Sequence, residues 1–104
     1  MNKSIKKPRN EDLYKAILTL RTLDECEHFF DDLCSVSELR AMEQRYQVAE
    51  LLDRGYIYND ILEITGASSA TISRVNRSLT YSNEGYEIVI SRMMQNREQN
   101  KEKA

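Results

Sequence analysis

Apolar side chains recur along the chain at intervals of three and four residues, which is the spacing of one face of an α-helix. These stripes predict helices over residues 10–21, 22–33, 35–54, 58–65, 68–79 and from about 82 to 95. Two capping boxes, Thr22 with Glu25 and Ser35 with Glu38, mark the starts of the second and third helices. The pattern therefore predicts an all-α protein of about six short helices.

The composition agrees with a helical chain. The 104 residues include 3 glycines and 1 proline, too few for the many tight turns of a sandwich or barrel. No apolar run approaches the roughly 18 residues of a membrane span, and no apolar stretch follows the basic N-terminus as in a signal peptide. We therefore expect a cytoplasmic protein with no membrane partner: a flexible basic arm over residues 1–9, one helical domain over 10–95, and a flexible polar tail over 96–104.

Cysteine and histidine usage argues against metal binding and catalysis. Cys26 and Cys34 stand eight residues apart in one predicted helix, about 12 Å along its axis, which is beyond the reach of a disulfide. His28 is the only histidine and has Asp24 and Asp32 as neighbours on its helix face, which favours a solvated side chain. There is no Gly-rich phosphate loop and no H-E-x-x-H motif. The sequence predicts no catalytic residue, no metal site and no cofactor.

The segment from residue 58 to 79 is typical of a helix-turn-helix. Gly66 can adopt the left-handed backbone that a sharp turn requires, and Ile61, Ile72 and Val75 can then meet as an apolar wedge. The opposite face of the second helix carries small, hydroxyl and arginine side chains, which suit close entry into a DNA major groove. The residues predicted to bind DNA are Ser68, Ser69, Ala70, Thr71, Ser73, Arg74 and Arg77.

The charge distribution supports this interpretation and leaves alternatives. The net charge is −2, yet no acidic residue occurs between Glu63 and Glu84. Two alternatives remain open. The segment could be a helical hairpin with no binding role. The chain could also be a protein-interaction module that uses the acidic helix face from Asp24 to Asp32 or the apolar C-terminal helix. Binding to DNA with low sequence specificity is a third reading, although the negative net charge opposes it.

The same residues resemble a known family. Ser35 to Leu79 is similar to the Trp repressor superfamily and looks most like its YerC/YecD group of bacterial proteins. The resemblance covers roughly residues 10–95 and implies an intertwined, six-helix homodimer whose two recognition helices enter successive major grooves of double-stranded DNA, acting as a transcriptional repressor. It is carried by Phe30–Cys34, Gln44-Arg45, Ala49–Leu52, Arg54-Gly55, Gly66–Arg74 and Asn76–Leu79.

The resemblance also implies an effector pocket. Arg45 and Arg74 match the two arginines that flank the corepressor's indole ring, and Ser35 matches a nearby threonine. Val75, however, stands where the family has a glycine beneath the indole, so it takes up space in the slot. The stretch between Gly55 and Gly66 is also one residue shorter than the corresponding stretch of the Trp repressor. We therefore do not expect L-tryptophan to bind. A different small effector, or no effector, remains open. For Arg45, a salt bridge to a nearby acidic residue on the same helix is the alternative to a ligand role.

Overall fold

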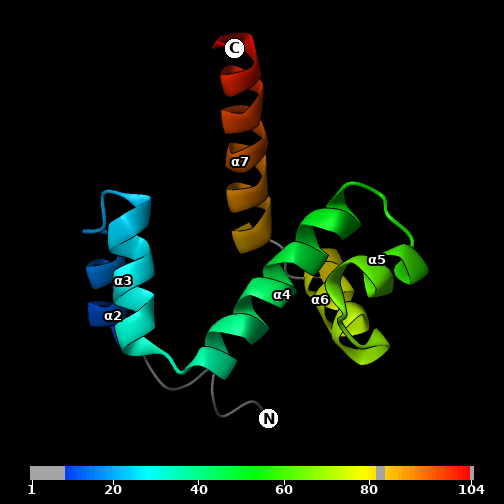
Figure 1. Cartoon of the computed structure of the whole chain (residues 1–104), viewed down its shortest axis with the longest axis horizontal. Helices are drawn as coiled ribbons and strands as arrows, with labels where there is room; N and C mark the ends of the chain where they lie inside the picture. Colours follow the sequence, from blue (N-terminus) through cyan, green and yellow to red (C-terminus); the bar gives the residue numbers. More distant parts are fainter. Residues whose placement is uncertain (1–8, 82–83, 104) are drawn as a thin grey trace. The chain divides into compact units, whose positions relative to one another are not determined.

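The computed structural model describes residues 9–81 and 84–103, and these residues form helices and no strand (Figure 1). The all-α fold class is confirmed. The helices are α2 (Glu11–Ile17), α3 (Leu23–Leu33), α4 (Val36–Asp53), α5 (Tyr58–Thr65), α6 (Ser69–Tyr81) and α7 (Glu84–Lys103). The predicted basic arm lies outside the described residues except for Arg9, and the last residue of the predicted tail lies outside them too.

Both capping boxes form, because each pairs a hydroxyl with a carboxylate three residues later. The N–H of Glu25 donates to Thr22 Oγ1 at 3.1 Å. The N–H of Glu38 donates to Ser35 Oγ at 3.2 Å, and the Glu38 carboxylate accepts the Ser35 N–H at 2.7 Å. These bonds satisfy amide groups that have no partner inside the helix.

The first helix ends earlier than predicted, at Ile17 instead of near Arg21. The N–H groups of Thr19 and Leu20 donate to carbonyls three residues back, and the Thr19 hydroxyl donates to the Ala16 carbonyl at 2.7 Å. A threonine hydroxyl that donates to a backbone carbonyl competes with the hydrogen bonds of the helix. The chain therefore tightens into a turn before α3.

The chain forms two compact units, one ending at Leu39 and the other beginning at Arg40. The boundary between the units falls near the start of α4, and the domain predicted over residues 10–95 stays a prediction. None of the described residues of the first unit is buried. Phe29 and Phe30 meet edge to face at 5.5 Å between ring centres, while Leu18 and Leu23 are 82% and 76% exposed.

The buried core lies in the second unit, where α5 and α6 pack beside α4 (Figure 1). Ile61 and Ile72 are fully buried and Val75 is 2% exposed, which confirms the predicted wedge. Complete burial of such a side chain contributes about 1.5–3 kcal/mol to stability. The other members of the core are Val48, Ala49, Leu51, Ala67 and Ile90.

A polar cluster joins α4 to α7 within the same unit. Glu50, whose side chain is 15% exposed, accepts Arg97 Nη2 at 2.9 Å and the Tyr46 hydroxyl at 3.0 Å on the same carboxylate oxygen. Burial, reinforced by the hydrogen bond to Glu50, raises the pKa of Tyr46. The last helix, predicted to end near residue 95, continues to Lys103 as α7, and the flexibility of the predicted polar tail stays a prediction. Arg97 gives this polar half a contact with α4, and no glycine or proline follows Gly85 to break the helix.

The capping box of α4 makes stability depend on pH in a defined direction. The hydrogen bond from the Ser35 N–H lowers the pKa of Glu38. A lowered folded-state pKa means that the stabilisation is present above the unfolded pKa and is lost as pH falls through the folded value. We expect Glu38→Gln to lose less stability than the parent between about pH 7 and about pH 3, measured by urea unfolding.

The matched control is Glu27→Gln on α3, since Glu27 is also exposed. This variant should keep the pH dependence of the parent protein. Equal pH slopes for Glu38→Gln and the parent, together with an ordinary glutamate pKa for Glu38 in an NMR titration, would contradict the assignment.

Candidate nucleic-acid interface

The turn between α5 and α6 sets the direction of the second helix. Gly66 has φ 71° and ψ 7°, the left-handed conformation that glycine adopts at little cost. Its N–H donates to the Leu62 carbonyl at 2.9 Å. The Thr65 hydroxyl donates to the Ile61 carbonyl at 2.7 Å and accepts the Ala67 N–H at 3.0 Å. These hydrogen bonds use the Gly66 and Ala67 N–H groups and the Thr65 hydroxyl within the helix-turn-helix, which favours the observed shape of the turn.

Ser68 is the residue that caps α6. Its hydroxyl oxygen accepts the Thr71 N–H at 3.1 Å and donates to Thr71 Oγ1, also at 3.1 Å. Ser68 directly precedes the helix, which begins at Ser69. The hydroxyls of Ser68 and Thr71 are thus engaged with each other, and Ser68 and Ser69 are both exposed.

The predicted DNA-binding residues share one side of the helix-turn-helix. Thr71 is half-buried, and all the others are exposed, while Ile72 and Val75 on the opposite face are buried. Within the described part of the chain, no carboxylate forms an ion pair with Arg74 or Arg77. The exposed set, from the turn outward, is Ser68, Ser69, Ala70, Ser73, Arg74 and Arg77.

The predicted effector residues belong to both compact units. Ser35 caps α4 in the first unit, whereas Arg45 and Arg74 are exposed in the second. Val75 belongs to the core, which agrees with the expectation that its side chain fills space. Among the residues with described positions, Arg45 has no carboxylate within ion-pair distance, so the alternative of a plain salt bridge gains no support. The pocket itself stays a prediction.

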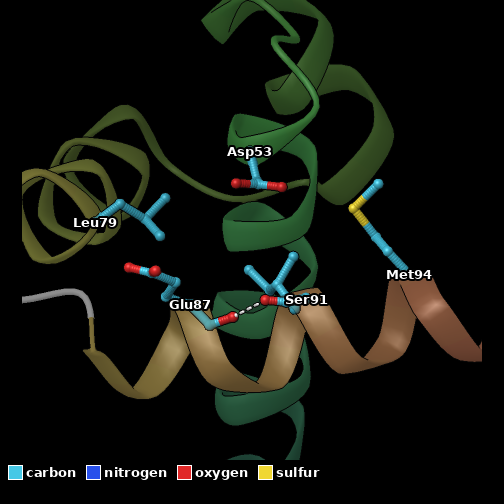
Figure 2. Close-up of a pocket in the computed structure, with 6 residues that line it drawn as sticks. Asp53, Leu79, Glu87, Ser91 and Met94 are labelled. Carbon is cyan, nitrogen blue, oxygen red and sulfur yellow. Dashed lines mark hydrogen bonds between the residues drawn. The ribbon is translucent and has the colours of Figure 1, made fainter.

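The second unit contains a cavity that the sequence did not predict. It holds about 370 Å³ and lies among side chains of α4, α6 and α7 (Figure 2). Ser91 Oγ at its edge donates to the Glu87 carbonyl at 2.7 Å. None of the predicted effector residues lines it. No local pattern signals such a cavity, because its walls come from residues up to 41 positions apart in the sequence: Asp53, Leu79, Glu87, Ile90, Ser91 and Met94.

Other candidate chemistry is sparse in the described ranges. Cys26 and Cys34 are free, half-buried thiols. His28 Nε2 lies 3.8 Å from the Asp24 carboxylate, and both side chains are largely exposed. Residues 9–81 and 84–103 contain no group of three or more potential metal ligands. No helix in these ranges combines the length and apolar character needed to cross a bilayer.

Comparison with known proteins decides the family. The family model described as Trp repressor protein matches residues 10–94. The chain belongs to the Trp repressor family. This confirms the resemblance seen in the sequence, and it places the chain in the general class of helix-turn-helix DNA-binding regulators.

Relatives within the Trp repressor family are similar over most of their length. The uncharacterized protein YerC of Bacillus subtilis (strain 168) is 47% identical over 83 residues, 80% of each chain. A Staphylococcus aureus crystal structure provisionally assigned as a Trp repressor matches with TM-score 0.81 and 46% identity, over 88% of this chain and 95% of that one. A TrpR-like protein from Eubacterium eligens ATCC 27750 gives TM-score 0.80 and 49% identity over the same shares.

The cap of α6 yields a test of local structure. Ser68→Ala removes the hydroxyl that accepts the Thr71 N–H, so we expect a loss of about 1 kcal/mol in the free energy of unfolding. Ser69→Ala makes the same chemical change one residue later, at an exposed position, and should stay within about 0.5 kcal/mol of the parent. Urea denaturation measures both. Equal effects of the two changes would mean that Ser68 is not the cap.

Proposed function

We propose that the chain is a sequence-specific DNA-binding transcriptional regulator, expected to act as a repressor in the cytoplasm, that places α6 in the major groove. The observation that carries the proposal is the division of α6 into a buried apolar face and an exposed face with two arginines, Arg74 and Arg77, that have no ion-pair partner among the described residues. A helix anchored in this way can present its outer face to DNA without rotating.

The composition of the exposed face suits recognition. Ser69, Ala70 and Ser73 are small, so the start of α6 can approach the floor of a groove closely. Arg74 and Arg77 can then reach phosphates or the acceptor edge of guanine. Because the net charge is −2, non-specific attraction to the phosphate backbone should be weak. Weak non-specific attraction together with side chains that can contact bases favours binding that depends on base sequence.

A homodimer is the second part of the proposal. Several large apolar side chains of one chain are solvent-exposed, including Leu23 on α3 at 76% and Ile88 on α7 at 50%. Exposed apolar faces on a soluble chain mark association surfaces, and most soluble oligomers pair identical surfaces around a two-fold axis. A second copy would cover these faces and present two copies of α6 to one side of a duplex.

The proposal is tested first by selecting bound duplexes from a random DNA pool at near-physiological salt. We expect enrichment of a two-fold symmetric motif with half-sites about one helical turn apart. The selection is run with and without L-tryptophan, and we propose that the amino acid changes neither the motif nor the yield. Failure to enrich any motif by folded, soluble protein in either arm would overturn the proposal of specific binding.

A single arginine tests the assigned face. Arg77→Ala should weaken binding to the selected site by about 1–3 kcal/mol for each protomer, and it should reduce the salt slope of the binding constant by about one unit if Arg77 meets a phosphate. Fluorescence anisotropy over a range of salt concentrations measures both quantities.

The matched control is Arg40→Ala, which removes the same charge from an exposed residue of α4 that pairs with Glu43 at 3.0 Å. Its affinity and salt slope should equal those of the parent. An Arg77→Ala protein with an unchanged affinity and slope would remove Arg77 from the interface, and full activity of the double change Arg74→Glu plus Arg77→Glu would favour a protein-interaction role instead.

A further inference from the structure

One long-range hydrogen bond ties the helix-turn-helix to α4. Gln44, half-buried on α4, donates from Nε2 to the carbonyl of Thr65 at 3.2 Å, across 21 residues of sequence. Thr65 is the last residue of α5. The last four carbonyls of a helix have no N–H donor within that helix, and the Thr65 carbonyl is one of them. The glutamine amide supplies the missing partner.

This hydrogen bond lies where it can affect the orientation of α6. Thr65 directly precedes the left-handed Gly66, and its own hydroxyl holds the N–H of Ala67 at 3.0 Å. Ser68, which caps α6, follows one residue later. The carbonyl that Gln44 holds is therefore three residues from the start of the exposed face of α6, so a change in the turn would displace that face.

We propose that Gln44 is a positioning residue for DNA recognition: through the Thr65 carbonyl it sets the angle of the α6 N-terminus relative to α4. The inference rests on the proposed DNA-binding function. Gln44 lies on α4, outside the exposed face of α6, and carries no charge. Its contribution is therefore to the geometry of base contacts and not to the attraction of phosphates.

The test uses Gln44→Met, which preserves side-chain length and removes the donor, and Gln44→Glu, which preserves shape and cannot donate when ionised. We expect affinity for the selected site to fall by about tenfold in both variants. Affinity of Gln44→Met for random duplex and its salt slope should match the parent, because no phosphate contact is lost. Amide exchange at Gly66 and Ala67 should accelerate in the DNA-free protein.

The control is Gln47→Met, the same change one turn later on α4, where the side chain is exposed. It should behave as the parent in every assay. Equal losses of specific and random-duplex binding with a lowered Tm would indicate general destabilisation and overturn the inference. Parent-like binding by Gln44→Met would overturn it as well.

The exchange measurement separates this inference from the proposed function. If the parent protein enriches no DNA motif, the proposed function fails, but the exchange rates still report on the link between Gln44 and the turn. Unchanged exchange at Gly66 and Ala67 in both variants would show that Gln44 does not hold the turn, whatever the DNA result.

Discussion

The burial of Ile72 and Val75 against Ile61 and α4 is the constraint on which the candidate interface depends. A helix turns by about 100° per residue, so fixing these two side chains inward fixes which residues of α6 face outward. Arg74 and Arg77 lie outside because their neighbours are inside. The left-handed Gly66 makes this arrangement sterically cheap, but the apolar contacts hold it in place.

The small size of the core explains the rest of the organisation. Only eight apolar side chains among the described residues are buried, all of them in the second unit. The first unit leaves most of its leucines exposed because a pair of short helices has too little surface to bury them by itself. A short chain that leaves so much apolar surface exposed is better suited to association than to a monomeric state. This is the physical reason for proposing a homodimer.

Polar contacts join the helices where the apolar core ends. The polar half of α7 has no apolar stripe of its own, and the ion pair of Arg97 with Glu50 ties it to α4 across 47 residues. The bond from Gln44 to Thr65 does the same for the recognition turn. Both contacts join helices distant in sequence, and both involve side chains that look, in isolation, like ordinary surface residues of an amphipathic helix.

The sequence by itself determined the features that depend on neighbouring residues. The capping boxes at Thr22 and Ser35, the left-handed turn at Gly66 and the inward face of α6 all follow from residues within a few positions of one another. Only the tertiary structure decided the continuation of α7 to Lys103, the division near Leu39, the cavity beside Asp53 and the role of Gln44. These depend on which helices meet in space, and helix periodicity reveals that a face is apolar without revealing its partner.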